Sequence, residues 1–461
     1  MAKPFTPRPY QVIGQQFIAE HKRCALWAGM GMGKTSMGLN VLDAIHNVAG
    51  EEAPSIIFAP LRVARDTWPE ETTKWTHLEG FEVVPICGTP AERKAALRRD
   101  AQVFSINYEN VPWLVETLGD RWRFENVIAD ESTKIKSFRL QGGGTRAKAL
   151  AGVAHAKVKR WVNLTGTPAS NGMVDLWGQT WFLDEGRRLG RTFTSFQERF
   201  FRPLRNDDGY YDWVATEYTQ EQIMPRLKDI CLTLDPRDWF DLRAPIITPV
   251  RVKLPPAVMR KYKEMENDFF TEIGGFDIEA FAAASKSQKL LQIAAGNIWV
   301  DRGTSHWEPI HEAKLEALDS IVSEANGMPV LCAYQWVPDR ERILKAFPRA
   351  VDLATPEGMA AFRAGKSPLG IAHPQSLGHG VDGLQNVTNI IAFYSDWWAL
   401  EPHDQILERI GPVRQMQAGH DRPVFVYHIV AEGTVDTVLM ARHQGKRDVQ
   451  DLLLEYMKGK R

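Results

Sequence analysis

The chain has 461 residues, 44% of them hydrophobic and 25% charged, which excludes an intrinsically disordered protein and predicts about two or three folded domains. Its 56 Lys and Arg balance 57 Asp and Glu, giving a net charge of −1, so any polyanion would have to bind a local basic patch. The four cysteines form no CxxC pair, so neither a zinc ribbon nor a disulfide framework is predicted, and a reducing compartment fits best.

The N-terminal residues have no apolar core of a signal peptide, and no run of about 18 apolar residues occurs anywhere in the chain. We therefore expect a cytoplasmic protein with no membrane partner. The 12 histidines show no metal-ligand spacing along the sequence, so no metal site is predicted from them.

Short apolar runs bounded by Gly, Pro and Asp alternate with helical patterns at both ends of the chain. In the first part they are Cys24 to Ala28, Ser55 to Ala59, Phe81 to Ile86, Val103 to Ile106, Val127 to Ala129 and Trp161 to Leu164. In the last part they are Val330 to Tyr334, Leu369 to Ala372, Asn389 to Phe393 and Val424 to Ile429. Strands alternating with helices predict an α/β fold with parallel sheets covered on both faces.

The residues between these two series are rich in charged and aromatic side chains and are predicted to be helical with long loops. We therefore predict three parts: an N-terminal domain over 1–183, a helical and loop extension with a linker over 184–326, and a C-terminal domain over 327–461.

The segment Ala28–Thr35 follows the first apolar run and opens a helical pattern, which matches the Walker A phosphate-binding spacing. Its glycines, which let backbone N–H groups close around phosphate oxygens, are Gly29, Gly31 and Gly33. Lys34 would supply a cation for the β and γ phosphates, and the Thr35 hydroxyl would bind Mg²⁺. The alternative is a flexible glycine turn before a helix.

A second motif lies about 95 residues further on. Asn126 to Thr133 has the form of a Walker B strand that ends in two adjacent carboxylates. Asp130 would hold Mg²⁺ through its waters, and Glu131 would orient and deprotonate the attacking water. Alone, two acids at a strand end could equally be a solvated turn, but the phosphate loop upstream favours the catalytic interpretation.

Further segments resemble motifs of one family. Arg8 to Gln11 with Gly14 resembles the adenine-reading segment of superfamily II helicases. Ala59 to Leu61, followed by Trp68 and Glu70, is similar to their first DNA-contacting motif. Leu164 to Pro168, then Asn171 and Leu176-Trp177, resembles the motif that couples hydrolysis to DNA. The last two segments have the residues of the Swi/Snf-type branch, and the order and spacing of all three agree with the family across the N-terminal part.

The resemblance continues in the C-terminal part. His311 to Leu318 and Val330 to Tyr334 resemble the entry helix and first strand of the second lobe. Gly378 to Gln385, which includes Gly380, is similar to the glycine-rich DNA and nucleotide motif in a form associated with bacteriophage members. Trp397-Trp398 and Gln405 to Gln415 stand where the tryptophan and arginine-finger motifs belong.

The arginine motif departs from the family pattern. Gln405 and Arg409 fit, but Pro412 occupies the place of the next arginine, and Arg414 is the nearest substitute. The resemblance implies that Arg409, and Arg414 if the finger has moved, reach the γ phosphate from the opposite lobe. The alternative is that both are surface charges or interlobe salt bridges.

The resemblance implies two RecA-like lobes of the P-loop NTPase type, with ATP and Mg²⁺ in the cleft between them. Tyr10 and Gln11 would read the adenine, and Gly380 would contact the nucleotide. The enzyme would be a DNA-dependent ATP hydrolase of a phage or a bacterium, acting in the bacterial or phage-infected cell. No metal beyond nucleotide-bound magnesium is implied.

We expect an ATP-dependent translocase on duplex DNA, with little sequence preference because backbone contacts carry no sequence information. The sequence does not identify the proteins on DNA that it would remodel or strip. Two alternatives stay open: a strand-separating or fork-remodelling helicase of the same fold, and a DNA-binding scaffold with a weakened ATPase.

Overall fold

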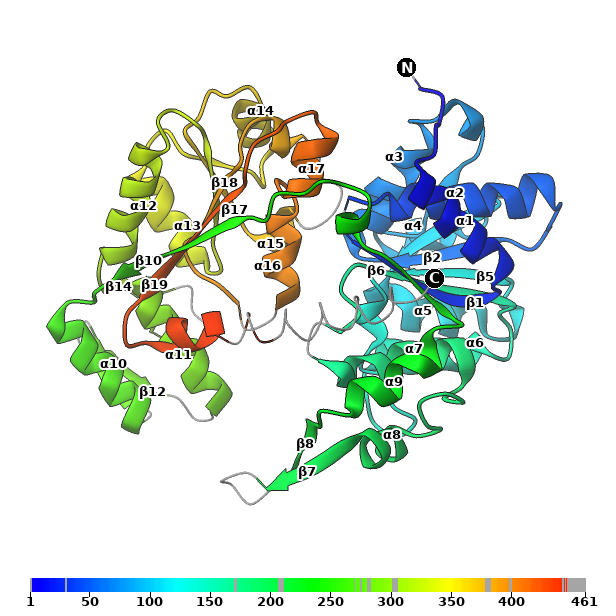
Figure 1. Ribbon diagram of the computed structural model, residues 1–461, viewed down its shortest axis with the longest axis horizontal. Coiled ribbons are helices and arrows are strands. Elements are labelled where there is room, and N and C mark those ends of the chain that lie inside the picture. Colours follow the sequence, from blue (N-terminus) through cyan, green and yellow to red (C-terminus); the bar gives the residue numbers. More distant parts are fainter. Residues whose placement is uncertain are drawn as a thin grey trace. The chain divides into compact units, whose positions relative to one another are not determined.

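The computed structural model forms two compact units, unit 1 (Met1–Asp241) and unit 2 (Leu242–Gly445) (Figure 1). The structure describes residues 2–29, 31–169, 172–205, 211–268, 270–273, 276–279, 283–300, 306–377, 383–397, 400–441, 443 and 445. No helix among these residues is long and apolar enough to cross a membrane.

Unit 1 is built on a seven-stranded parallel sheet with the order β3-β4-β2-β5-β6-β1-β9. Its strands are β1 (Arg23–Ala28), β2 (Ser55–Ala59), β3 (Val83–Pro85), β4 (Val103–Asn107), β5 (Asn126–Asp130), β6 (Arg160–Thr165) and β9 (Cys231–Leu234). The six apolar runs of the N-terminal series all form strands of this sheet, so the predicted parallel α/β fold is confirmed here.

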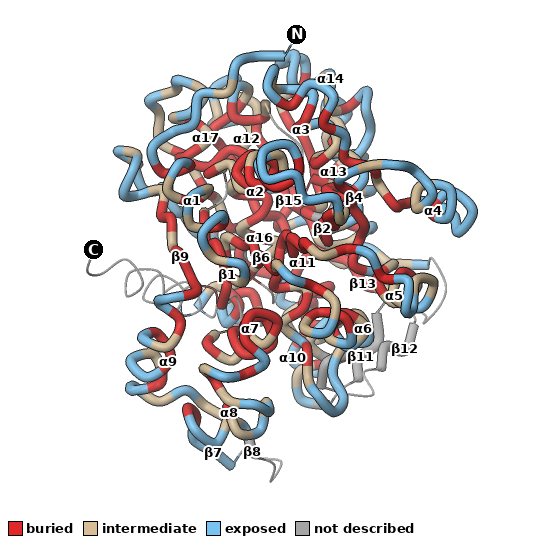
Figure 2. Tube along the Cα trace, turned by 90° about the vertical axis from the view of Figure 1, so that its right-hand side faces the viewer, coloured by how far each residue is buried: buried red, intermediate tan, exposed pale blue. Residues whose placement is uncertain are grey.

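Helices cover both faces of this sheet: α1 (Pro9–Glu20), α2 (Lys34–Asp43), α3 (Trp68–Thr72), α4 (Pro90–Ala96), α5 (Val111–Leu118), α6 (Thr145–Ala154) and α7 (Leu176–Asp184). Alternate residues of each strand therefore enter two separate cores: Ile56 and Phe58 pack in one, Ile57 and Ala59 in the other. Figure 2 shows the resulting burial of the strands.

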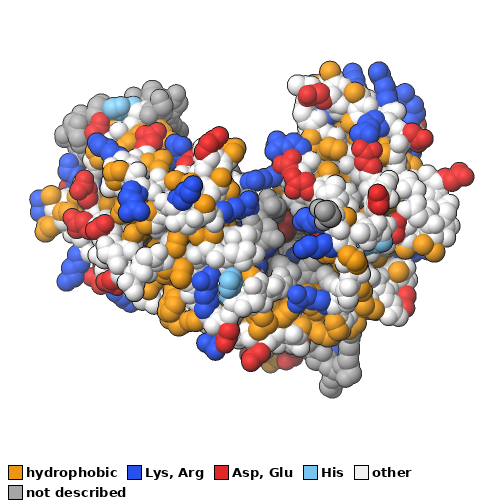
Figure 3. Space-filling view, turned by 90° about the horizontal axis from the view of Figure 1, so that it is seen from above, with side chains coloured by type: hydrophobic (Ala, Val, Ile, Leu, Met, Phe, Trp, Pro, Cys, Tyr) orange, Lys and Arg blue, Asp and Glu red, His pale blue; other side chains and the backbone are white. Residues whose placement is uncertain are grey.

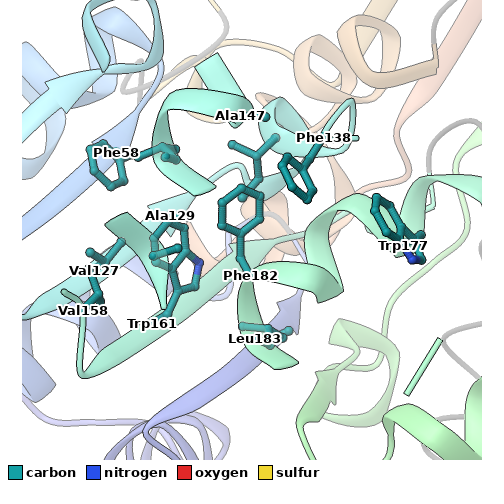
Figure 4. Close-up of a cluster of buried hydrophobic side chains, with 14 of the residues drawn as sticks. Phe58, Val127, Ala129, Phe138, Ala147, Val158, Trp161, Trp177, Phe182 and Leu183 are labelled. Atoms are coloured by element: carbon teal, nitrogen blue, oxygen red, sulfur yellow. The ribbon is translucent and has the colours of Figure 1, made fainter. Parts of the chain in front are cut away.

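Aromatic rings fill the core between this sheet and α7 (Figure 4). Trp161 of β6 stacks on Phe182 of α7 with ring centroids 4.9 Å apart, and Phe138 stacks on Trp177 at 5.8 Å. Such pairs stabilise beyond the area that they bury. They hold α7, and with it the loop that follows β6, firmly against the sheet.

Unit 2 contains a six-stranded parallel sheet with the order β10-β19-β18-β15-β17-β16. The strands are β10 (Ile246–Val252), β15 (Val330–Ala333), β16 (Val351–Asp352), β17 (Leu369–Ala372), β18 (Ile390–Phe393) and β19 (Phe425–Ala431). The helices are α12 (Ala313–Glu324), α13 (Val337–Ala346), α14 (Pro356–Arg363), α15 (Pro374–Leu377), α16 (Leu400–Leu407) and α17 (Pro412–Gln417). Two further cores lie on its faces, so the second predicted parallel sheet is also confirmed.

The stretch 184–326, which the sequence sets apart as one extension, is shared between the two units. Unit 1 takes α8 (Phe193–Phe200), the hairpin of β7 (Phe201–Arg205) and β8 (Tyr211–Ala215), α9 (Thr219–Leu227) and β9. Unit 2 takes β10, α10 (Pro256–Asp268), β11 (Phe270–Ile273), β12 (Phe276–Glu279), α11 (Ala283–Ala295), β13 (Asn297–Trp299) and β14 (Trp307–Pro309).

The difference from the predicted boundaries has a physical reason. β9 is a buried edge strand of only four residues, and β10 is an edge strand that is largely exposed, so neither shows a long apolar run. β9 joins its sheet by backbone pairing to β1, and β10 joins its sheet by backbone pairing to β19. Hydrophobic periodicity in the sequence does not encode such pairing. On the face shown in Figure 3, basic and acidic side chains are interspersed, as the balanced composition predicts.

Candidate nucleotide and coupling site

The phosphate loop lies between the end of β1 and the start of α2, as predicted. Gly31 and Gly33 have φ angles of 78° and 77°, which side chains rarely adopt. A Cβ at Gly33 would also come within 2.4 Å of Gln11 Nε2. The backbone conformation of the loop therefore favours glycine at both positions.

Lys34 begins α2, and its ammonium lies over the loop. Its Nζ donates to the carbonyl of Ala28 at 2.8 Å and approaches that of Gly29 at 3.4 Å. Thr35, the next residue, is half-buried in the first helical turn. The N-terminal amides of a helix, together with a lysine at this position, form a site suited to phosphate oxygens.

Gln11 approaches the loop from α1. Its Oε1 accepts from Arg8 N at 2.9 Å, and its Nε2 lies 3.5 Å from the hydroxyl of Ser36. That hydroxyl donates to Gly33 O at 2.9 Å. The structure thus brings Gln11 to the phosphate loop through Ser36.

The neighbouring Tyr10 is buried in an aromatic cluster. Its ring lies 5.7 Å from Trp239 and 5.8 Å from Phe240, and the Arg8 guanidinium lies 5.4 Å from the Phe240 ring. Burial raises the pKa of the Tyr10 hydroxyl. Sequence reasoning did not single out Trp239 or Phe240, because they follow β9 in a stretch without a recognisable motif.

The carboxylate pair stands at the end of β5. Asp130 and Glu131 are only 6% and 8% exposed, which excludes a solvated turn. Asp130 Oδ2 accepts from Trp68 Nε1 at 2.9 Å, and Oδ1 accepts from the Glu131 amide at 3.1 Å. Burial raises the pKa of Asp130, and the charge of Lys34 opposes that rise.

Glu131 has a left-handed backbone, with φ 53°. This conformation costs energy for a residue other than glycine, and in other proteins such residues cluster at functional sites. The strand thus ends at Asp130. The side chains of Asp130 and Glu131 therefore do not continue the alternation of strand residues between the two faces of the sheet. A short 3₁₀ turn over Ser132–Ile135 follows.

Gln179 of α7 connects the turn after β5 with the loop after β6. Its Oε1 accepts from Ser132 Oγ at 2.8 Å. Its Nε2 donates to the carbonyls of Pro168 at 2.8 Å and Asp175 at 3.0 Å. Its own carbonyl accepts from Asn163 Nδ2 at 3.0 Å. Gln179 is 5% exposed and was missed from the sequence, since one glutamine in an apolar helix carries no motif.

The arginine motif belongs to unit 2. Arg409 is buried just after α16, and Arg414 is half-buried in α17, whose first residue is Pro412. Arg409 is too enclosed to be a simple surface charge, whereas the half-buried Arg414 leaves that alternative open. Gln415 anchors α17 by donating to Thr388 O at 2.8 Å. The predicted nucleotide contact Gly380, and Asn171 and Trp398, lie outside the described residues.

Comparison with known proteins identifies the family. The model of the SNF2-related domain matches residues 15–280. Protein p41 of Acyrthosiphon pisum secondary endosymbiont phage 1 is 50% identical over 99% of this chain and 100% of that protein. The nuclear protein STH1/NPS1 of Saccharomyces cerevisiae is 22% identical over 98% of this chain, which spans only 35% of that protein's length.

Among solved structures, the Sulfolobus solfataricus SWI2/SNF2 ATPase core in complex with dsDNA aligns with a TM-score of 0.45 and 21% identity, covering 99% of this chain and 95% of that one. The family model covers more than half of the chain, and the phage relative matches nearly all of it. The chain belongs to the SNF2-related family, the Swi/Snf-type branch of superfamily II, and resembles its phage members.

Proposed function

We propose that this protein is a DNA-dependent ATPase that couples ATP hydrolysis to movement along duplex DNA. Membership of the SNF2-related family supports an ATPase in general, with ATP and a divalent metal ion as its ligands. The observation that carries the proposal is geometric: Lys34 Nζ lies over the phosphate loop, 2.8 Å from the carbonyl of Ala28, and the buried Asp130 and Glu131 stand at the end of β5, in the same sheet as β1. A purely DNA-binding scaffold has no need of this arrangement.

The residues of unit 1 divide the chemistry between them. The loop amides and Lys34 bind the β and γ phosphates, and Thr35 and Asp130 hold Mg²⁺. The metal ion, when bound, neutralises charge that develops on the phosphate oxygens. Glu131, directly after Asp130, orients a water and accepts its proton. The donor set of a hydroxyl and a carboxylate suits Mg²⁺, which prefers oxygen ligands.

Coupling to DNA would pass through Gln179. This side chain bonds both the turn after Glu131 and the loop after β6, which resembles the family motif that couples hydrolysis to DNA. A shift of either segment changes the hydrogen bonds of the other. The resemblance of Leu164 to Pro168 to the Swi/Snf form of that motif favours a duplex as the ligand here.

The test is ATP hydrolysis by the full chain with no DNA, with single-stranded DNA and with duplex DNA of the same length. We expect duplex to stimulate hydrolysis most, with no dependence on its sequence. Displacement of a third strand from a triplex then reports movement along the duplex. Stronger stimulation by single strands would favour a strand-separating helicase, and DNA binding without hydrolysis would favour a scaffold. Lys34→Ala is the negative control.

A further inference from the structure

Asp396, His403, His428 and His443 meet inside unit 2, well away in sequence from the nucleotide motifs. Asp396 follows β18, His403 lies in α16, and His428 lies in β19. All three imidazoles are buried, with side chains 0%, 7% and 4% exposed in chain order. Burying this many ionisable groups in one place is costly unless they share a cation.

The imidazole nitrogens converge on one atom, Asp396 Oδ2. His428 Nδ1 lies 3.3 Å from it, His443 Nδ1 3.7 Å and His403 Nε2 3.9 Å. Ligand atoms of Asp396, His403 and His443 all lie within 4.8 Å of one another. Ligands about 2.0–2.2 Å from a tetrahedral ion are about 3.3–3.6 Å apart. The separations of 3.7 and 3.9 Å from Asp396 Oδ2 to His443 Nδ1 and His403 Nε2 are close to this range, and ion binding would have to draw in the pairs that lie nearer the 4.8 Å limit.

Hydrogen bonds on the opposite side of two rings fix which nitrogen faces the carboxylate oxygen. His443 Nε2 lies 2.6 Å from the carbonyl of Trp397, which only accepts, so Nε2 carries the proton. His403 Nδ1 lies 3.2 Å from Asp404 Oδ1, which likewise accepts. In the neutral rings, His443 Nδ1 and His403 Nε2 therefore direct lone pairs toward Asp396 Oδ2. Two ring nitrogens and a carboxylate oxygen thus face one point, which is a donor set suited to a cation.

The nearest lysine does not provide that cation. Lys314 lines the same small cavity as Asp396 and His428. However, its ammonium pairs with Asp436 at 2.7 Å and donates to Tyr394 O at 3.2 Å. Among the described residues, Lys314 is therefore engaged elsewhere, and the donor set of the cluster is one that a metal ion can use. The outward hydrogen bonds of both rings are the arrangement that metal-ligating histidines show.

We propose that Asp396, His403 and His443 bind one divalent transition metal ion of the Zn²⁺ class. His428, 3.3 Å from the carboxylate, supports Asp396, and Asp404 orients His403. Imidazole and carboxylate ligands suit Zn²⁺ and its neighbours rather than Mg²⁺. The ion would tie α16 to β18 and to His443, and Arg409 follows two residues after α16 ends. Its role is to brace the arginine motif.

The experiment measures bound metal directly. The full chain, purified without a histidine tag, is equilibrated with Zn²⁺, passed through a desalting column and analysed for zinc. We expect about one equivalent in the wild type and in the control His420→Gln, whose imidazole lies outside the cluster. His403→Gln and His443→Gln should each retain less than about a tenth of that. Asp404→Asn should weaken binding about 10–100-fold.

Cobalt gives a second measurement that needs no variant. Co²⁺ added to the wild-type chain should produce visible absorption bands of a low-coordinate site, and Zn²⁺ should abolish them. The proposal is overturned if the wild type shows no zinc above background and no cobalt bands, which would assign protons to the cluster. It is also overturned if both histidine variants keep full zinc. These measurements do not depend on ATP hydrolysis, so they stand apart from the proposed motor function.

Discussion

At the scale of single residues, the charge on Asp130 is the critical quantity of the nucleotide site. A carboxylate that is 6% exposed is costly to ionise. The Trp68 indole and the Glu131 amide each donate to it, and Lys34 adds a positive charge nearby. Mg²⁺ would favour the ionised form further. In the proposed function, this site would therefore favour a cation that arrives together with the nucleotide.

Lys34→Ala should abolish hydrolysis. The loop amides still surround phosphate, but no ammonium replaces the one at the β and γ oxygens. Turnover measured with duplex DNA should fall below about a tenth of wild type, while DNA binding largely survives. Lys74→Ala, which removes only an exposed pair with Glu71, is the matched control. A Lys34→Ala chain that keeps more turnover than this would remove Lys34 from the mechanism.

Glu131→Gln should separate binding from hydrolysis. The amide keeps the shape of the side chain but cannot accept a proton from water. ATP should bind with nearly unchanged affinity and stay unhydrolysed, so the variant should accumulate in an ATP-bound state on DNA. The measurement is nucleotide retention after rapid filtration, alongside turnover. Normal hydrolysis would mean that another residue activates the water.

Trp68→Phe should affect the metal ion. The ring still packs in the core, but Asp130 loses the 2.9 Å hydrogen bond from the indole. A buried bond to a charged group contributes about 1.5–3 kcal/mol, so the free energy of unfolding should fall by this order. The Mg²⁺ concentration for half-maximal hydrolysis should change with it. Trp75→Phe loses a comparable bond to Glu71 near the surface and should leave the Mg²⁺ dependence unchanged.

At the scale of elements, α7 is fixed to the turn after β5 by close backbone contact as well as by hydrogen bonds. A Cβ at Gly178 would lie 2.2 Å from the carbonyl of Lys136. Lys136 in turn pairs with Asp175 at 2.9 Å, just before α7. The helix and the turn therefore move as one body. The adjacent Gln179 extends this body to the loop after β6.

Gln179→Met tests this connection. The volume is similar, but the bonds to Ser132 and Pro168 are lost. Basal hydrolysis should persist because Gln179 does not touch the nucleotide site, whereas stimulation by duplex DNA should drop several-fold. Gln179→Glu keeps an acceptor for Ser132 and should recover part of the stimulation. Gln102→Met, on the surface, is the control. Equal stimulation in Gln179→Met and wild type would rule out this route of coupling.

The strands of both sheets could be predicted because buried parallel strands are continuous apolar runs. The positions of the Ala28–Thr35 loop after β1 and of the carboxylate pair at the end of β5 could be predicted because such motifs have fixed residue types at fixed spacing, while their chemical roles stay predictions. Trp239 and Gln179 could not, since tertiary contacts alone bring them to the site. The histidine cluster was missed for the same reason: His403 and His443 are 40 positions apart and become neighbours only through β18, α16 and β19.

At the scale of the whole molecule, the two units carry complementary parts of one proposed reaction. Unit 1 holds the phosphate loop and the carboxylates, and unit 2 holds Arg409 and Arg414. Each unit has its own sheet and its own cores. Nucleotide binding can therefore be a property of unit 1, whereas rapid hydrolysis would require the arginines of unit 2.

Arg409→Ala should lose most DNA-stimulated hydrolysis while ATP affinity, set mainly by Lys34 and the loop amides, falls only modestly. An arginine that stabilises transition-state charge contributes roughly 10³-fold or more to the rate in other phosphoryl-transfer enzymes. Arg414→Ala should show the same loss if Arg414 takes the role of the arginine that the family pattern places at position 412. Turnover and nucleotide affinity, measured separately with duplex DNA present, distinguish this loss from weakened binding.

The double variant Pro412→Arg with Arg414→Ala then tests whether an arginine at position 412 can take over the role of Arg414. Pro412 is the first residue of α17, where its missing N–H is not needed, so replacing it should leave the helix intact. Recovered hydrolysis would show that α17 places its N-terminal turn and Arg414 toward the same phosphate. If Arg409→Ala and Arg414→Ala both hydrolyse ATP at the wild-type rate, the interlobe finger is wrong. An arginine supplied by another subunit would then be the better explanation.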